Sequence, residues 1–249
     1  MSRIIMIKTA IIIPSRLDAQ RLPNKPLKLI KGKEMILHVY DIATKAQVGD
    51  VIVATPDQKI VDIVKAHGGK AIITNKNHQT GTDRIYEVFE KELNKKTDMI
   101  INLQGDMPNL DPLAIKHLIN HMKKNTYDIA TLASDIQFDD EIKDQNICKV
   151  VTNEKISIGK YSDAVDFYRL SKERFPDLTY HHIGIYAYSR KALNKYVSLK
   201  RSKLEVDRKL EQLRALENKM TITVGYIKSC PLSVDTEQEL LKIKNIMEN

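Results

Sequence analysis

The chain alternates short apolar runs with longer stretches in which apolar residues recur at helical spacing. The apolar runs lie at residues 4–13, 50–54, 70–74 and 98–103. Runs of this length, bounded by turn residues, are typical of strands buried on both faces of a parallel sheet. The helical stretches between them lie at residues 34–46, 56–66 and 82–93. This alternation predicts an α/β fold with a doubly wound, mostly parallel sheet.

The second half of the chain continues the pattern of strands and helices. Helices are expected at residues 112–124 and 202–217, and a final helix opens at residues 233–236. Strands are expected at residues 127–134, 180–188 and 221–227. A chain of 249 residues suits one large α/β domain that can hold a substantial insertion.

Composition and charge then limit the class of protein. Hydrophobic residues make up 42% and charged residues 29%, which is ordinary for a soluble globular protein. No apolar run approaches the roughly 20 residues needed to cross a bilayer, so we expect a cytoplasmic protein with no membrane contact. The net charge is +8, but the lysines are scattered and no arginine-rich patch occurs. Nucleic acid is therefore not an expected partner, whereas a nucleoside triphosphate explains part of the excess charge.

Two further residue pairs could carry chemistry but are expected to be structural. Cys148 and Cys230 form no metal or redox motif, and we expect both to be buried as small apolar side chains. His117 and His121 stand four apart on an expected helix, but no carboxylate partner stands at a matching position. We expect both histidines to be solvated.

The loop that follows the first apolar run is the first candidate site. Arg16, Arg21 and Lys25 lie within ten residues and alternate with prolines, which fix φ and hold the backbone open. A stiff cationic loop at the carboxyl end of a central strand is where open α/β sheets bind phosphates. A solvated basic loop is the alternative, and the glycine spacing of a Walker A loop is absent.

Two more loops and one later segment carry candidate chemistry. Gly81 lets the backbone approach a ligand, and Thr82 or Asp83 can cap the following helix. Asp106 comes after a buried strand and directly after a glycine. A carboxylate at this position suits a hard cation that bridges phosphate oxygens, and a plain turn is the alternative. Asp235 precedes the final helix and could be only its cap.

Taken together, these strings resemble the 3-deoxy-manno-octulosonate (Kdo) cytidylyltransferases, also called CMP-Kdo synthetases. PSRLDAQRLPNKPL is similar to the family's P-A-R-x-x-S-T-R-L-P-G-K-P-L, and HQTGTDR is similar to H-Q-S-G-T-D-R. QGDMP is similar to the family's Q-G-D-E-P, except that Met107 replaces the common glutamate. HHIGIYAY, KLEQLRALE and VDT follow in the family's order. The resemblance covers nearly the whole chain and is interrupted mainly at residues 137–180.

The resemblance implies a Rossmann-like nucleotidyltransferase domain over residues 1–249. It also implies a smaller sugar-binding and dimerisation insertion around residues 137–200. The implied reaction transfers CMP from CTP to the anomeric hydroxyl of Kdo, a 2-keto-3-deoxy sugar acid, and releases pyrophosphate for lipopolysaccharide biosynthesis. Mg²⁺ is the implied cofactor, and a homodimer is the implied assembly.

The resemblance also implies a role for individual residues. The catalytic residues are expected to be Arg16, Lys25, Asp106 and Asp235, of which the two aspartates bind Mg²⁺. The nucleotide-binding residues are expected to be Arg16, Arg21, Lys25, Thr80, Gly81 and Gln104. The substrate-binding residues are expected to be Arg84, Gln104, Asp163, His182, Tyr186, Glu211 and Gln212.

One segment departs from the family and leaves alternatives open. Asp163 stands where the family has an arginine near the sugar, and Arg169 could serve in its place. An aspartate there could instead pair with the ammonium of 8-amino-8-deoxy-Kdo. The alternatives are a cytidylyltransferase for that sugar or for a sialic acid, and a catalytically silent nucleotide-binding paralogue.

Overall fold

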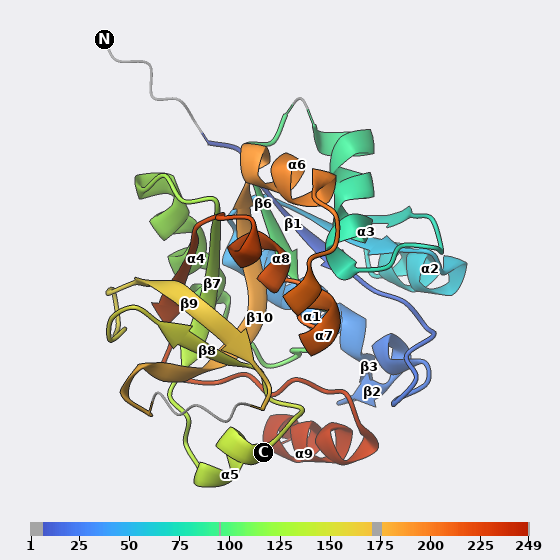
Figure 1. Ribbon diagram of the computed structural model, residues 1–249. Coiled ribbons are helices and arrows are strands. Elements are labelled where there is room, and N and C mark those ends of the chain that lie inside the picture. The colour runs from blue at the N-terminus through green and yellow to red at the C-terminus, as the bar shows by residue number, and fades with distance from the viewer. Residues whose placement is uncertain (1–6, 95, 171–175, 249) are drawn as a thin grey trace. The chain divides into compact units, whose positions relative to one another are not determined.

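The chain passes from one structural unit into a second and then returns to the first. The computed structural model describes residues 7–94, 96–170 and 176–248 (Figure 1). Unit 1 comprises Met1–Ile119 and Pro231–Asn249, and unit 2 comprises Asn120–Cys230. The insertion expected around residues 137–200 falls inside unit 2, apart from residues 171–175, which lie outside the described residues.

Unit 1 contains parallel strands in the order β5-β4-β1-β6. Their bounds are Thr9–Pro14 for β1, Asp50–Thr55 for β4, Ala71–Ile73 for β5 and Met99–Leu103 for β6. The central strands β1 and β6 are buried along almost their whole length, because both faces of a parallel sheet are covered. The expected α/β class with a parallel sheet is confirmed. Residues 4–6 of the first predicted strand lie outside the described residues.

The helices of unit 1 follow the predicted alternation closely. They are α1 Met35–Ala46, α2 Gln58–Ala66, α3 Gly81–Val88 with a π-helical turn Phe89–Leu93, and α9 Glu237–Glu248; α4 Pro112–Lys124 crosses into unit 2. A 3-10 turn, η1 Lys25–Leu27, and a hairpin of β2 Leu29–Ile30 with β3 Lys33–Glu34 precede α1.

Two predicted helix starts are wrong by a few residues. Pro56 precedes α2 and does not occupy its first position, because the helix begins at Gln58 after Asp57. Thr82 and Asp83 do not cap α3, because the Thr80 hydroxyl already accepts a hydrogen bond of 3.1 Å from the Asp83 backbone N–H. Thr80 is therefore the cap.

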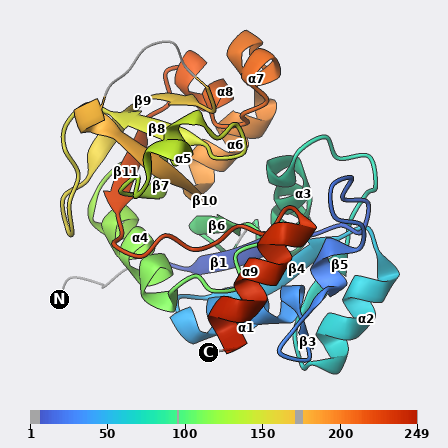
Figure 2. The same cartoon turned by 90° about the horizontal axis from the view of Figure 1, so that it is seen from below.

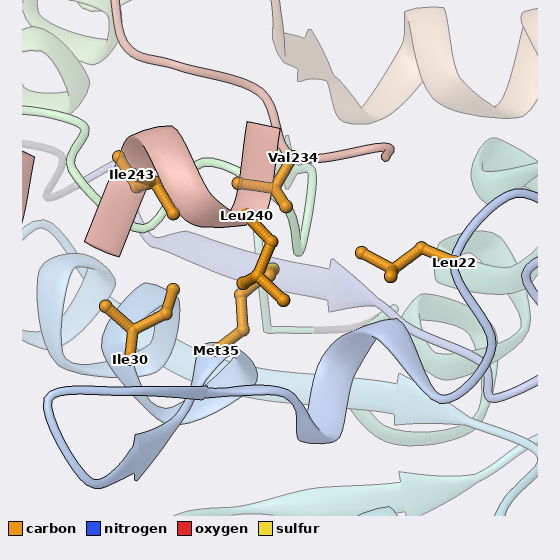
Figure 3. Packing of buried hydrophobic residues seen from close by; sticks show 6 residues of the cluster. All are labelled: Leu22, Ile30, Met35, Val234, Leu240 and Ile243. Carbon is orange, nitrogen blue, oxygen red and sulfur yellow. The ribbon is translucent and has the colours of Figure 1, made fainter. Parts of the chain in front are cut away.

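A buried apolar cluster joins the two sequence-distant parts of unit 1 (Figure 3). Its members come from the loop, hairpin and helix that follow β1 and from the segment that ends in α9 (Figure 2). They are Leu22, Ile30, Met35, Val234, Leu240 and Ile243. The cluster holds the segment before α9 against the loop that precedes α1, and each of these segments carries a predicted site residue.

Unit 2 contains strands in the order β10-β7-β11-β9-β8, and β8 also pairs with β10, so these pairings close on themselves. Their bounds are β7 Ile129–Ser134, β8 Lys149–Thr152, β9 Ser162–Tyr168, β10 Thr179–Ser189 and β11 Ile222–Tyr226. The helices are α5 Asp139–Lys143, α6 Arg190–Ser198, α7 Lys203–Arg208 and α8 Leu213–Glu217, and a short 3-10 turn is Pro176–Leu178. The strand predicted at residues 180–188 is confirmed.

The single helix expected at residues 202–217 is wrong, because the chain turns at Lys209, which has φ of 54°. A buried ion pair explains the turn: Arg214 Nη2 lies 2.6 Å from Glu205 Oε1, and neither side chain is more than 3% exposed. In one straight helix, residues nine apart would point to opposite sides. The break lets the two charges meet, and it places Glu211 and Gln212 between helices.

No helix in the described residues is long and apolar enough to span a membrane.

Leu240→Ala is predicted to destabilise unit 1 by about 2–5 kcal/mol, because it opens a cavity in the apolar cluster where Leu240 is 2% exposed. The neighbouring Leu241→Ala is the matched control, since Leu241 is 57% exposed and its loss should cost at most about 0.5 kcal/mol. Urea unfolding of both variants measures the difference. Equal losses in the two variants would contradict the described packing of α9.

Candidate active site

Four charged side chains from three remote segments of unit 1 form one ion cluster. Lys25 Nζ donates hydrogen bonds of 2.9 Å to Asp106 Oδ2 and of 2.9 Å to Asp235 Oδ1. Arg21 Nη2 donates a hydrogen bond of 2.7 Å to Asp235 Oδ2. We name Arg21, Lys25, Asp106 and Asp235 the Lys25 cluster. The structure thus brings together four of the residues that the resemblance predicted for the nucleotide and metal site.

The local backbone explains how Lys25 reaches this position. Asn24 has φ of 55°, in the left-handed region where glycine or asparagine is favoured, and the 3-10 turn begins immediately after it. The family's glycine at this position meets the same requirement, so the change to Asn24 keeps the turn. Leu22 is buried in the apolar cluster and anchors the loop. The prediction of an open, non-helical loop is therefore wrong at Lys25–Leu27.

The residues at the start of α9 fix the positions of the two aspartates of the cluster. The Val234 backbone N–H donates a hydrogen bond of 2.9 Å to the Asp106 carbonyl oxygen, which ties the two aspartate loops together. Thr236 and Glu239 form a reciprocal cap: the Thr236 hydroxyl accepts from Glu239 N, and Glu239 Oε2 accepts from Thr236 N. Glu239 Oε2 also accepts from Asp235 N at 2.7 Å. Because Thr236 takes the capping role, the Asp235 carboxylate is left for Lys25 and Arg21.

Lys25 is held protonated by its neighbours. Its side chain is 16% exposed, and this burial opposes the charged form, but Asp106 and Asp235 outweigh burial and raise the pKa of Lys25. The cluster contains two cations and two carboxylates, so its charges balance within one site. An anionic ligand that draws a cation away would leave carboxylates able to bind a metal ion.

The Lys25 cluster contains two carboxylates that could hold Mg²⁺. The Lys25 ammonium already sits 2.9 Å from an oxygen of each aspartate, so both carboxylates can reach a common cation. Carboxylate oxygens suit Mg²⁺, which often takes one or two of them and fills its shell with waters and substrate phosphates. Among the described residues no group of three or more His, Cys, Asp or Glu could hold a metal ion. The residues therefore fit Mg²⁺ bound together with a phosphate ligand.

The remaining cations of the predicted nucleotide site have different surroundings. Arg16 is exposed and pairs with Asp18 at 3.1 Å. Arg84 is buried, and its Nη1 donates hydrogen bonds of 2.6 Å to Thr74 Oγ1 and 3.0 Å to the Asn75 carbonyl oxygen. Burial and the nearby Arg16 charge lower the pKa of Arg84. These bonds hold the end of β5, and a substrate contact for Arg84 stays a prediction.

Gly81 and Gln104 meet beside the end of β1. A Cβ atom at Gly81 would lie 3.4 Å from Pro14 Cγ and 3.8 Å from Gln104 Nε2. Gln104 Nε2 donates a hydrogen bond of 3.0 Å to Asn102 Oδ1 in β6. Thr80, as the cap of α3, immediately precedes Gly81. The structure therefore brings these three predicted nucleotide-binding residues to the carboxyl ends of β1 and β6.

Glu87 fixes the loop that leads into this region. Its carboxylate accepts hydrogen bonds from the Asn75 backbone N–H, from His78 and from Lys91. Burial opposes the charge, but the bonds to Lys91, His78 and Asn75 together lower the pKa of Glu87 to about 2. The sequence pattern did not single out Glu87.

A second group of predicted residues lies in unit 2. The rings of His182 and Tyr186 have centroids 5.5 Å apart, as expected for strand residues on one face, although β10 has a register shift between Ile183 and Tyr186. The Phe167 ring meets His182 edge-on at 5.0 Å. Burial and then the nearby charges of Cys148, Tyr188 and Glu211 raise the pKa of Tyr186, so Glu211 also lies close.

Gln212 joins the same region, since its Nε2 lies 3.5 Å from Cys148 Sγ, and the Cys148 carbonyl oxygen accepts from His182 N. The sequence singled out neither Phe167 nor a contact role for Cys148, because such contacts leave no periodic pattern.

His182 is a neutral hydrogen-bonding group with a defined tautomer. Burial, with smaller effects of the His181 and Arg169 charges, lowers the pKa of His182 to about 3. Thr131 Oγ1 lies 2.7 Å from the Ile185 carbonyl oxygen and 3.0 Å from His182 Nε2. A hydroxyl has one proton and a carbonyl only accepts, so Thr131 donates to Ile185 and accepts from His182 Nε2. Nδ1 of His182 is then an acceptor, which suits a sugar hydroxyl.

Asp163 and Arg169, the two alternative contacts for the sugar acid, have different surroundings. Asp163 is exposed on β9 and pairs in register with Thr223 of β11. Arg169 lies near the His182 group, because its charge contributes to the lowered pKa of His182, and it donates to the carbonyl oxygens of Gln145 and Asn146. Arg169 is therefore one of the positive charges near the predicted sugar residues, together with His181, and a sugar contact for Arg169 or Asp163 stays a prediction.

The chain is similar to known proteins over most of its length. A family model described as cytidylyltransferase matches residues 10–222 of the chain. The chain belongs to the cytidylyltransferase family. Within it, the 3-deoxy-manno-octulosonate cytidylyltransferase of Brucella ovis is 42% identical over 234 residues, which are 94% of this chain and 93% of that relative. The enzyme of the same name from Bartonella bacilliformis is 42% identical over 97% of this chain and 99% of its own length.

A solved structure agrees with these relatives. CMP:2-keto-3-deoxy-manno-octonic acid synthetase complexed with CTP matches with a TM-score of 0.87 and 36% identity, over 97% of this cytidylyltransferase and 98% of that chain. The resemblance to CMP-Kdo synthetases, the nucleotidyltransferase fold and the enzyme class are confirmed. The roles of individual residues stay predictions.

Glu87→Gln is predicted to destabilise this cytidylyltransferase at neutral pH but not in strong acid. Because folding lowers the pKa of Glu87 from 4.5 to about 2, its carboxylate stabilises the fold above pH 4.5, and this stabilisation is lost as the pH falls towards 2. Free energies of unfolding at several pH values measure the effect. Glu92→Gln is the control, since that side chain is 44% exposed. A difference between wild type and Glu87→Gln that does not change with pH would contradict the assignment.

Proposed function

We propose that this protein transfers CMP from CTP to the anomeric hydroxyl of Kdo and releases pyrophosphate. The observation that carries the proposal is the similarity to 3-deoxy-manno-octulosonate cytidylyltransferases over nearly the whole chain. The Lys25 cluster supports it, because it provides cations for a triphosphate and carboxylates for a metal at one place. The product would serve lipopolysaccharide biosynthesis.

The unit 1 residues are assigned to the nucleotide. In nucleotidyl transfer a hydroxyl attacks the α-phosphorus, and charge on the phosphoryl oxygens and the leaving pyrophosphate sets the barrier. Arg16, Arg21 and Lys25 bind the triphosphate and offset this charge. When bound by Asp106 and Asp235, Mg²⁺ supplies Lewis-acid neutralisation at the phosphates. Lys25 exchanges a carboxylate partner for a phosphate as CTP arrives, and the negative phosphate replaces that carboxylate in keeping Lys25 protonated.

The unit 2 residues are assigned to the sugar acid. His182, held neutral with Nδ1 as an acceptor, receives a hydrogen bond from a sugar hydroxyl. Tyr186, Glu211 and Gln212 provide further donors and acceptors around it. Arg169 binds the carboxylate of the acid, because its charge lies near His182. The resemblance also leads us to propose a homodimer.

This arrangement favours Kdo over 8-amino-8-deoxy-Kdo, and nucleotidyl transfer over a silent paralogue. Asp163 is exposed on β9, so its carboxylate is not desolvated and would pair only weakly with the ammonium of an amino sugar. Asp106, Asp235 and Lys25 form a connected ion cluster, which supports nucleotide chemistry and not simple nucleotide storage.

Asp106→Asn and Asp235→Asn are each predicted to lower pyrophosphate release from CTP and Kdo by about a hundredfold, the effect of losing one well-placed electrostatic group. The assay is run over a series of Mg²⁺ concentrations, and the loss should be in kcat. Glu237→Gln is the control, because that nearby carboxylate is 64% exposed and lies 3.6 Å from Lys28 Nζ. Near-normal turnover in either aspartate variant would mean that the metal site lies elsewhere.

Arg169→Met is predicted to raise KM for Kdo about tenfold and leave KM for CTP unchanged, as expected for loss of a charge-assisted hydrogen bond to a carboxylate. Arg169→Lys should restore part of the loss. Asp163→Asn is the matched variant and should leave the kcat/KM ratio of Kdo to 8-amino-8-deoxy-Kdo unchanged. A changed ratio in Asp163→Asn, or a wild-type preference for the amino sugar, would assign the sugar contact to Asp163.

A further inference from the structure

Two of the predicted sugar-binding residues, Glu211 and Gln212, lie in the turn of residues 209–212 that joins α7 to α8. We name this segment the α7–α8 turn. Gln212 Nε2 donates a hydrogen bond of 3.5 Å to Cys148 Sγ, and the Cys148 carbonyl oxygen accepts one of 2.9 Å from the His182 backbone N–H. The turn therefore reaches the part of unit 2 that contains His182. Its conformation decides where Glu211 and Gln212 stand relative to that histidine.

A buried tyrosine of α6 holds the backbone of this turn. Tyr196 is 1% exposed, and its hydroxyl donates a hydrogen bond of 2.8 Å to the Glu211 carbonyl oxygen. The Arg214 backbone N–H donates to the same oxygen at 3.1 Å, so each lone pair of this carbonyl has a donor. Burial raises the pKa of Tyr196, so its hydroxyl stays a donor at physiological pH. The peptide plane between Glu211 and Gln212 is thereby fixed from two sides.

A buried ion pair fixes the tyrosine in turn. Arg214 Cζ lies 4.6 Å from the centroid of the Tyr196 ring, which is the distance of a cation–π contact. The guanidinium donates two hydrogen bonds to Glu205, from Nε to Oε2 at 2.8 Å and from Nη2 to Oε1 at 2.6 Å. Burial opposes the charge of Glu205, but the hydrogen bonds from Arg214 and Arg201 outweigh it and lower the pKa of Glu205. The two-bonded guanidinium has one orientation, and the Tyr196 ring packs against it.

The alternative role of this network is to stabilise the packing of α6, α7 and α8. A buried ion pair is a weak source of stability, because the desolvation of two charges offsets most of their attraction. Apolar side chains of similar volume often replace such a pair without loss of stability. A pair with two hydrogen bonds does fix one geometry, and here that geometry includes the ring whose hydroxyl holds Glu211. Apolar side chains could supply the packing but not this orientation.

We propose that Tyr196, Arg214 and Glu205 are positioning residues for the sugar acid. They act through the α7–α8 turn, which presents the side chains of Glu211 and Gln212 to the sugar hydroxyls. The inference rests on the proposed function, because that function assigns Glu211 and Gln212 to the sugar acid. Tyr196 therefore sets the affinity for the sugar without touching it, and the nucleotide residues of unit 1 do not depend on it.

The first test removes the tyrosine hydroxyl and keeps the ring. Tyr196→Phe should raise KM for Kdo about tenfold, while kcat and KM for CTP change by less than about twofold. Pyrophosphate release is measured with each substrate varied at a saturating level of the other. Tyr40→Phe is the matched control, because the Tyr40 hydroxyl of unit 1 also bonds to the backbone, accepting from Lys70 N at 3.0 Å. It should leave KM for Kdo unchanged even where it lowers the free energy of unfolding as much as Tyr196→Phe.

A double variant separates positioning from stability. Glu205→Leu combined with Arg214→Met removes both buried charges together, and Arg201, which loses a partner, is 44% exposed, so no unpaired charge stays buried. Urea unfolding should show a folded protein of near wild-type stability. KM for Kdo should nevertheless rise at least as much as in Tyr196→Phe, because the ring loses the guanidinium that orients it.

Three results would overturn the inference alone: a wild-type KM for Kdo in folded Tyr196→Phe, a wild-type KM for Kdo in the folded double variant, or an equal rise of KM for CTP. Absence of pyrophosphate release from CTP and Kdo by the wild type would overturn the proposed function and the inference together. The two failures are therefore distinguished in one set of assays.

Discussion

The ammonium of Lys25 between two aspartates is the interaction on which unit 1 depends. A mostly buried charge is tolerated only when its partners are in place, and these partners come from the loop after β6 and from the segment before α9. The Val234 hydrogen bond to Asp106 and the apolar cluster keep the segments together. The same constraint that holds the fold thus keeps two cations and two carboxylates together at one place.

The two units use opposite electrostatics. Unit 1 keeps its site charged, since the aspartates outweigh burial at Lys25. Unit 2 keeps its central imidazole neutral, because burial lowers the pKa of His182 and its Nε2 meets the uncharged Thr131 hydroxyl. Strong charge suits phosphates, whereas neutral donors and acceptors suit sugar hydroxyls, so the division matches the two substrates proposed.

The sequence predicted the features that burial and short motifs decide. The strands β1, β4 and β6 and the helix α1 follow directly from apolar periodicity, and the resemblance brought Lys25, Asp106 and Asp235 together. Features that depend on partners far apart in the sequence were not predicted. The break at Lys209 serves the Glu205–Arg214 pair, and the His181–Glu141 pair joins residues of β10 and α5. The local sequence pattern contains no information about contacts between distant residues, because each partner alone resembles an ordinary surface residue.

The discontinuity of unit 1 also has a consequence for biosynthesis. Residues 1–119 leave the ribosome first, but Asp235 and the apolar side chains of α9 follow only after all of unit 2 has been translated. A nascent chain therefore holds Arg21 and Lys25 for most of its synthesis without the second carboxylate that completes their site. The Lys25 cluster closes last, so an interrupted polypeptide lacks both the Asp235 carboxylate and the packing that stabilises the loop around it.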